Sequence, residues 1–128
     1  MNRKIKVMLV DDNKLDLFVH IELVEQMDIA HTILDYQFAT EALKYLKEND
    51  VSKWPDIILL DIYMPDINGH EVARRLRRLR TTKDIPILII SASDNPKDKS
   101  LSLDAGCNGY IAKPINIDCI SSQIAAFL

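Results

Sequence analysis

Short runs of apolar residues recur along the chain without the polar alternation of a half-exposed strand. The clearest runs are KVMLV, DIILL, PILII and GYIA, and the polar residues that close or follow them are Asp11, Asp12, Asp61, Ser91 and Lys113. Unbroken apolar runs are typical of parallel strands that are buried on both faces. Because ligands of such sheets bind outside the carboxyl ends of the strands, these polar residues form a candidate site along one edge.

The segments between the runs carry apolar residues at helical spacing. The first segment predicts a helix that buries Leu15, Phe18, Val19, Leu23 and Met27. Residues 32–38 predict a second strand, and Thr40 is expected to cap the helix that follows it. That helix is expected to bury Ala42, Leu43 and Leu46.

The later helices have clearer start signals. Asn68 and Glu71 have the spacing of a capping box, and the helix after them is expected to bury Val72, Leu76 and Leu79. Asn95 and Pro96 open the next helix, which ends at residues 104–106. Its apolar stripe is poor, essentially Leu101 and Ala105, so we expect it to be loosely packed and to be the helix that moves. A last helix is expected to bury Ile117, Ile120, Ile124 and Phe127.

Strand and helix signals therefore alternate as five βα units. This alternation predicts an α/β fold, an open doubly wound parallel sheet with right-handed crossovers and helices on both faces. A closed barrel of eight units would need about twice the length. With 128 residues, 48% of them hydrophobic, residues 1–128 are expected to form a single domain with no output domain.

Composition narrows the class of protein. A net charge of −3 argues against binding nucleic acid or an anionic membrane through bulk electrostatics. A local cluster of arginines lies opposite the apolar stripe of its helix and is interpreted as a solvated face, namely Arg74, Arg75, Arg77, Arg78 and Arg80. Cys107 and Cys119 lack CxxC spacing, and no run resembles a signal peptide or membrane span, so a cytoplasmic protein with reduced thiols is expected.

Three carboxylates gathered at one sheet edge would repel one another unless one is protonated or a cation lies between them. The candidate ligands are oxygens, and none of the three histidines, His20, His31 and His70, is expected beside the site. This donor set favours Mg²⁺ over zinc or copper. A lysine and a hydroxyl suit phosphoryl oxygens, and aspartate can act as a phosphoryl acceptor, so the site predicts Mg²⁺-assisted phosphoryl transfer onto Asp.

Four motifs in register, VDD, LLDIYMPDING, SA and KP, resemble the receiver domain of two-component response regulators over the whole chain. The resemblance implies a flavodoxin-like sheet with strand order 2-1-3-4-5. It also implies that Asp61 accepts a phosphoryl group from a phosphohistidine, while Ser91 and Lys113 bind the phosphoryl oxygens. The implied ligands of Mg²⁺ are Asp11, Asp12, Asp61 and the main-chain carbonyl oxygen of Tyr63.

By the same resemblance, Tyr110 occupies a switch position and the Lys113-Pro114 bond is cis. Drawing Ser91 toward the phosphoryl group would let Tyr110 rotate inward and shift the helix after the fourth strand. The surface made by the fourth helix, fifth strand and fifth helix would then control a downstream protein. The implied phosphodonor is a sensor histidine kinase or a histidine phosphotransfer protein, and a phosphorylation-dependent homodimer is a further candidate. The domain would be a signalling switch that catalyses its own aspartyl phosphorylation and dephosphorylation, without a nucleic-acid or membrane partner.

Tyr63 and Ser93 depart from the commonest pattern of that family and are expected to flank the acyl phosphate. Tyr63 is predicted to shield it from water and to slow self-dephosphorylation. A haloacid-dehalogenase-type phosphatase would need a second Asp at position 63, and a flavodoxin would place hydroxyl residues where Asp11 and Asp12 stand. A scaffold module that signals without phosphorylation remains an alternative. The kinase, the output, and whether the receiver is free-standing or part of a longer regulator are left open.

Overall fold

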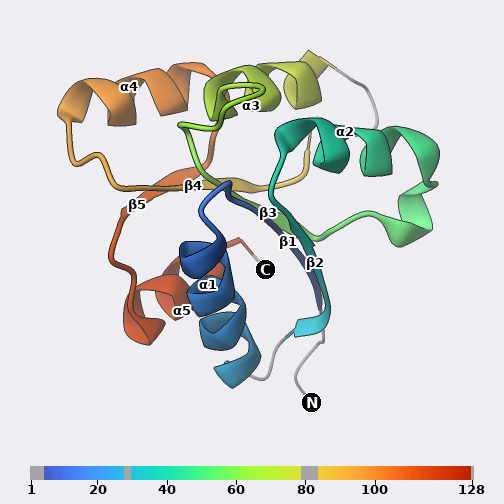
Figure 1. The fold of residues 1–128 in the computed structure, drawn as a ribbon, viewed down its shortest axis with the longest axis horizontal. Helices are drawn as coiled ribbons and strands as arrows, with labels where there is room; N and C mark the ends of the chain where they lie inside the picture. The colour runs from blue at the N-terminus through green and yellow to red at the C-terminus, as the bar shows by residue number, and fades with distance from the viewer. Residues whose placement is uncertain (1–4, 28–29, 79–83, 128) are drawn as a thin grey trace.

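The computed structural model describes residues 5–27, 30–78 and 84–127, which form a parallel sheet flanked by helices (Figure 1). The strands are β1 Ile5–Val10, β2 Ala30–Tyr36, β3 Ile57–Leu60, β4 Ile87–Ser91 and β5 Gly109–Ala112. The helices are α1 Lys14–Gln26, α2 Ala39–Glu48, α3 Gly69–Arg78, α4 Pro96–Asp104 and α5 Ile117–Ala125, with a 3₁₀ turn at Val51–Lys53. The strand order is β2-β1-β3-β4-β5 and every pair is parallel. The predicted fold class and strand order are confirmed.

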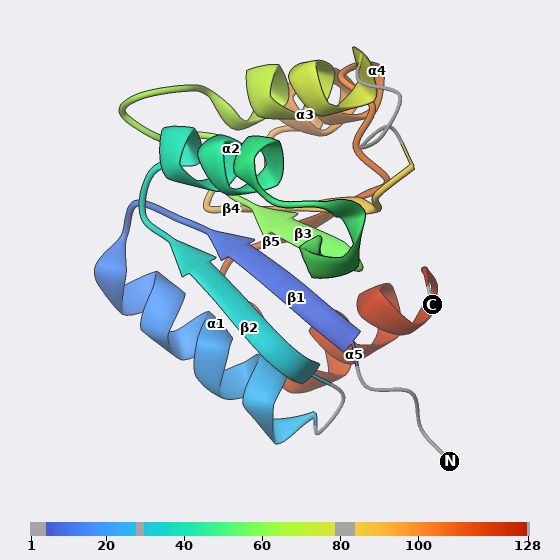
Figure 2. The same ribbon diagram turned by 90° about the vertical axis from the view of Figure 1, so that its right-hand side faces the viewer.

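The sheet separates two apolar cores. Helices α2, α3 and α4 cover one face and α1 and α5 cover the other, as both views show (Figures 1 and 2). Successive residues of β1 alternate between the cores: Met8 and Val10 pack toward α2 and α3, whereas Val7 and Leu9 pack toward α1 and α5. Because both faces of the pleat are buried, the strands need apolar residues at every position.

The strand register brings the carboxyl ends of the strands to one edge. Val10 pairs with Leu60, Leu60 with Ile89, and Ser91 with Ala112. Main-chain bonds carry the ladder past the strand ends: the N–H of Asp61 donates to the Val10 carbonyl at 3.0 Å, and that of Lys113 donates to the Ser91 carbonyl at 2.7 Å. The residues that follow these strands are therefore neighbours.

The buried face of α1 differs from the predicted one. Leu17, His20 and Val24 are buried, whereas the predicted stripe is largely in solvent: Leu15 is 71% exposed and Phe18 is 61% exposed. The helix carries apolar residues around much of its circumference, so two stripes at helical spacing compete. The predicted stripe consists of apolar residues only, whereas the face that meets the sheet includes the polar residue His20.

The starts of α2 and α3 are capped differently from each other. Thr40 was a wrong prediction as the cap of α2, because that helix begins at Ala39 after Phe38, which makes no side-chain cap bond. Instead the Asp66 carboxylate accepts the main-chain N–H of Thr40 at 2.8 Å. Asn68 accepts the N–H of His70 at 2.7 Å, as a capping residue should. The carboxylate of Glu71 pairs with arginines of its own helix.

Helix α4 is held by few apolar contacts, as predicted. Asn95 caps it and Pro96 opens it, and its buried residue is Ser102, while Leu101 is 41% exposed and Leu103 is 65% exposed. Gly106 follows it with a φ of 102°, a left-handed conformation that favours glycine at a helix end. In α5, Ile120 and Ile124 are buried as expected, but Ile117, also predicted to be buried, is 36% exposed at the start of the helix.

The arginines of α3 do not all lie on a solvated face. Arg74 and Arg75 are half exposed and pair with Glu71. Arg77 corrects the prediction, because its guanidinium donates to the carbonyls of Gly106 and Ile85 at 2.9 and 2.8 Å and to the Asn108 side chain at 2.8 Å. It ties α3 to the segments that flank β4 and β5. Leu79 and Arg80 lie outside the described residues.

Both cysteines are free, in line with reduced thiols. Within the part of the chain that the structure describes, no helix combines the length and hydropathy that crossing a bilayer requires.

Candidate functional site

Three aspartates converge at the carboxyl edge of the sheet. Asp11 and Asp12 follow β1 and Asp61 follows β3, and one carboxylate oxygen from each lies within 4.8 Å of the others. Asp11 and Asp61 are buried at 3% and 7% exposure, whereas Asp12 is open to solvent. Hard oxygen ligands with one open side fit Mg²⁺, which binds through a few carboxylates and keeps several waters.

Lys113, which follows β5, lies among these carboxylates. Its Nζ is 2.9 Å from Asp11 Oδ2 and 3.6 Å from Asp61 Oδ2. Burial would lower the pKa of Lys113, but hydrogen bonds to Asp11 and Asp16 raise it overall. The lysine is therefore charged and partly offsets the repulsion within the cluster.

Asp61 is strongly affected by its burial at the sheet edge. Burial raises its pKa to about 6, a shift that Lys113 opposes and Asp11 reinforces. One of its oxygens accepts the main-chain N–H of Ile62 at 2.8 Å. Burial favours the protonated form of Asp61. A cation bound beside it would stabilise the ionised form instead.

Asp16 is a site residue that sequence reasoning missed. It lies in the first turn of α1, and its Oδ2 is 2.8 Å from the Nζ of Lys113. The Asn13 side chain caps that turn by accepting the N–H of Asp16 at 3.0 Å. The apolar runs give no sign of Asp16, because it reaches the sheet edge from a helix and not from a strand end.

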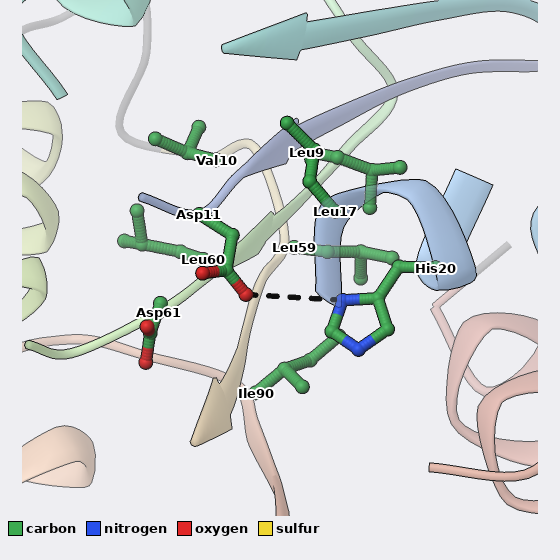
Figure 3. A pocket seen from close by; sticks show the side chains of 9 residues that line it. All are labelled: Leu9, Val10, Asp11, Leu17, His20, Leu59, Leu60, Asp61 and Ile90. Carbon is green, nitrogen blue, oxygen red and sulfur yellow. Dashed lines mark ion pairs between the residues drawn. The ribbon is translucent and has the colours of Figure 1, made fainter. Parts of the chain in front are cut away.

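His20 contradicts the prediction that no histidine lies beside the site. Its ring is buried, and its Nδ1 is 4.0 Å from Asp11 Oδ2. Figure 3 shows the Asp11 carboxylate between Asp61 and the His20 ring. These three residues are among those that line a cavity of about 10 Å³. Burial lowers the pKa of His20, although Asp11 opposes the shift. His70 lies elsewhere, with its Nε2 2.7 Å from the Ser102 hydroxyl.

Ser91 and Tyr110 lie at the end of β4 and in β5. Ser91 is fully buried, and its hydroxyl oxygen accepts the main-chain N–H of Ser93 at 3.2 Å. The Tyr110 hydroxyl donates to the carbonyl of Ser93 at 2.6 Å. Ser93 thus contacts both predicted switch residues. The Lys113-Pro114 peptide bond is cis, as the resemblance implies.

Tyr63 reaches from the β3–α3 loop to α4. Its side chain is 57% exposed, and its hydroxyl donates to Asp98 Oδ2 at 2.8 Å. The Ser93 hydroxyl donates to the same oxygen at 2.5 Å. The two residues that depart from the commonest pattern are therefore joined through one carboxylate of α4.

Gly69 sets how closely α3 approaches Asp61. A Cβ atom at position 69 would lie 2.2 Å from the main-chain oxygen of Asp61. The N–H of Gly69 also donates to the Ile62 carbonyl at 2.7 Å. Any side chain here would displace the strand end that carries Asp61, so glycine is needed for the close approach.

Comparison with known proteins identifies the class to which this fold and site belong. A model of the response regulator receiver domain matches residues 7–125. The chain therefore belongs to the receiver domain family of response regulators, which confirms the resemblance found in its motifs. Transfer of a phosphoryl group to an aspartate is the general function of this family.

Particular relatives place the chain more closely. Response regulator ArlR of Staphylococcus saprophyticus is 36% identical over 124 residues, which are 96% of this chain and 52% of ArlR. The chain thus spans about half the length of the curated relatives it matches. A phosphorylated cyanobacterial phytochrome response regulator, RcpA, is 30% identical with a TM-score of 0.80, covering 96% of this chain and 90% of RcpA. The chemotaxis protein CheY4 of Vibrio cholerae has a TM-score of 0.84 over 98% of this chain and 99% of its own at 22% identity, a likeness of fold.

Proposed function

We propose that Asp61 accepts a phosphoryl group from a phosphohistidine with the help of Mg²⁺, and that the resulting acyl phosphate switches the surface formed by α4, β5 and α5. The observation that carries the proposal is the meeting of Asp61 with Asp11, Asp12 and Lys113 at one sheet edge. Membership of the receiver family and the likeness to phosphorylated RcpA support it.

The transfer step needs a nucleophile and a way to neutralise charge. An oxygen of the Asp61 carboxylate bonds to phosphorus, the bond from phosphorus to the histidine nitrogen breaks, and the imidazole keeps the electron pair and takes up a proton. Asp11, Asp12, Asp61 and the main-chain carbonyl of Tyr63 would hold Mg²⁺. When bound, the ion supplies positive charge that stabilises the phosphoryl oxygens.

Lys113 and Ser91 are proposed to bind the phosphoryl group once it is attached. Lys113 Nζ lies 3.6 Å from Asp61 Oδ2 while it pairs with Asp11 and Asp16. A small movement away from Asp16 would let the ammonium pair with a phosphoryl oxygen. The Ser91 hydroxyl can donate to another phosphoryl oxygen. Rotation of the Ser91 side chain toward that oxygen would break the bond that its hydroxyl now accepts from the Ser93 N–H.

The switch is proposed to run from Ser91 through Ser93. Because Tyr110 donates to the Ser93 carbonyl, a shift of Ser93 would release the tyrosine hydroxyl and let the ring turn inward. Helix α4 has few apolar contacts to hold it in place, so this change can bias its position. The α4–β5–α5 surface would then be recognised by a downstream protein or by a second copy of the chain.

The phosphodonor is proposed to be a sensor histidine kinase or a histidine phosphotransfer protein, in the cytoplasm. Leu15 and Phe18 of α1 are 71% and 61% exposed, on the helix that also carries Asp16. This apolar surface beside the site suits contact with a protein donor.

Phosphoryl uptake tests the proposal directly. The protein incubated with acetyl phosphate and Mg²⁺ should gain one phosphoryl group by intact mass, and Asp61→Asn should abolish the gain. Asp104→Asn, an exposed aspartate at the end of α4, is the matched control and should be phosphorylated like the parent. No gain by the parent would favour the scaffold alternative.

A further inference from the structure

Asp98 joins three segments around the site. It lies in the first turn of α4, and its Oδ2 accepts hydrogen bonds from the Tyr63 hydroxyl at 2.8 Å and the Ser93 hydroxyl at 2.5 Å. Its main-chain oxygen accepts the Ser102 hydroxyl at 2.8 Å. One residue of α4 therefore contacts the loop that follows Asp61 and the loop that follows Ser91.

The two bonds to the Asp98 carboxylate are strong for exposed side chains. Hydrogen bonds to an ionised acceptor are about twice as strong as neutral ones. Bonds from Ser93 and Tyr63 lower the pKa of Asp98, and its bond to Asp98 raises the pKa of Tyr63. Both shifts correspond to a hydroxyl proton held toward an ionised carboxylate.

The Tyr63 ring needs such an anchor to keep one position. Its side chain is 57% exposed, so packing alone does not fix its rotamer. With its hydroxyl on Asp98, the ring spans the gap between the β3–α3 loop and α4, two residues after Asp61. Without that bond, the ring is free to swing into solvent.

We infer that Asp98 is a positioning residue that holds Tyr63 over the phosphorylated Asp61, so that the position of α4 sets how long the acyl phosphate survives. This inference rests on the proposed function of Asp61. Ser93 connects Ser91 to Tyr110 and also to Asp98. A shift of Ser93 would therefore affect the Asp98–Tyr63 contact as well as Tyr110.

The reaction that Tyr63 would hinder is hydrolysis of the acyl phosphate. A water oxygen bonds to phosphorus while the bond between phosphorus and the Asp61 oxygen breaks. The electron pair returns to Asp61 as a carboxylate, and both water protons leave with inorganic phosphate. A ring held beside phosphorus excludes that water, whereas a displaced ring admits it.

The lifetime of the phosphorylated protein tests the inference. The full chain and its variants are phosphorylated with acetyl phosphate and Mg²⁺, the donor is removed, and loss of the phosphoryl group is followed by intact mass. Asp98→Ala and Tyr63→Phe should each speed the loss by about two- to tenfold, the range that one net hydrogen bond supports. The double variant should be no faster than Asp98→Ala, because Asp98→Ala already removes the bond that Tyr63→Phe removes.

Two matched variants separate positioning from a general effect on α4. Asp98→Asn keeps an oxygen that accepts the Tyr63 hydroxyl but loses the charge, so it should speed the loss of the phosphoryl group less than Asp98→Ala does. Asp104→Ala removes an exposed carboxylate from the other end of the helix and should leave the lifetime unchanged. In the unphosphorylated protein, Asp98→Ala should also move the ring signals of Tyr63 in a tyrosine-labelled NMR spectrum.

An unchanged lifetime in Asp98→Ala would overturn the inference, as would full additivity with Tyr63→Phe. In both cases normal phosphoryl uptake would leave the proposed function of Asp61 intact. Failure of the parent to take up phosphate would overturn the proposed function together with the inference.

Discussion

The surroundings of Asp61 disfavour the charged form of its carboxylate. It is 7% exposed, shares the sheet edge with Asp11, and has its pKa raised to about 6. A raised pKa means that the protonated form favours folding: its contribution is fully present at acid pH and is lost as pH rises through about 6. Near neutral pH, without a metal, the ionised Asp61 therefore destabilises the fold.

Replacing Asp61 with Asn should stabilise the metal-free protein. At pH 7.5 with a chelator, urea unfolding of Asp61→Asn should show a gain of about 1–3 kcal/mol over the parent, because the neutral amide removes the buried charge. The gain should shrink at pH 4.5, where the parent carboxyl is itself protonated. Saturating Mg²⁺ should also reduce the stability difference between the two proteins, because the ion should stabilise the parent more than Asp61→Asn. A less stable Asp61→Asn in the chelator at pH 7.5 would contradict this account.

Some site residues could be predicted from the sequence and others could not, for a geometric reason. Asp11, Asp61, Ser91 and Lys113 stand where apolar runs end, so parallel pairing alone places them together. Asp16 reaches the same edge from α1 and depends on how that helix packs. The sequence pattern does not determine which face of α1 meets the sheet, so it could not place Asp16 at the site.

Helix α4 is fixed to its neighbours by polar contacts more than by apolar packing. The His70 ring of α3 meets the Ser102 hydroxyl of α4 at 2.7 Å, and Ser102 donates onward to the Asp98 carbonyl. Because the Ser102 hydroxyl has one proton to give, Nε2 of His70 is the donor in their contact. Burial and the nearby Arg74 lower the pKa of His70, with Asp98 opposing.

The packing of α3 against α4 should become less stable in acid, because burial disfavours the charged form of His70. The unfolded chain takes up a proton on His70 near its ordinary pKa of 6.5, but the folded protein does so only at lower pH. Stability therefore falls as pH drops through that range. Amide exchange of α4, corrected for intrinsic rates, should be faster at pH 5.5 than at pH 7.5.

His70→Gln is the matched control for this pH effect. Its amide can still donate to Ser102 but does not titrate, so most of the extra exchange at pH 5.5 should disappear. His20 also has a lowered pKa and is present in both proteins, so the difference between them isolates His70. Equal acid sensitivity in the parent and the variant would show that the effect arises elsewhere.

Elements were predictable where one signal dominated. The weak stripe of α4 and its Asn95-Pro96 start were read correctly, because proline and a capping side chain act locally. The buried face of α1 was predicted incorrectly, because Leu15 and Leu17 belong to two competing apolar stripes. The Thr40 cap failed for a related reason: Asp66, which supplies the cap, comes from a loop 26 residues away in sequence.

The whole molecule joins a stable sheet to one weakly packed helix. Strands β1, β3 and β4 are buried on both sides, so the sheet holds the residues at its carboxyl edge in fixed positions. Helix α4 is linked to that site through Asp98 in its first turn, which accepts the hydroxyl of Ser93 in the β4–α4 loop. Coupling of this kind is reciprocal in binding free energy. A partner that prefers the phosphorylated form should therefore favour phosphorylation by the same free energy by which phosphorylation strengthens the binding of that partner.

Phosphorylation should therefore alter one region of the molecule and leave the rest unchanged. In hydrogen exchange with and without acetyl phosphate in the presence of Mg²⁺, the β4–α4 loop, α4 and β5 should change protection. Strand β2 and helix α2, which follows it, should not, because β2 lies at the edge of the sheet opposite β5. Asp61→Asn, given the same donor, should show no change anywhere. Unchanged exchange in α4 and β5 of a fully phosphorylated parent would rule out the switch, since Ser91 would then bind phosphate without moving Ser93.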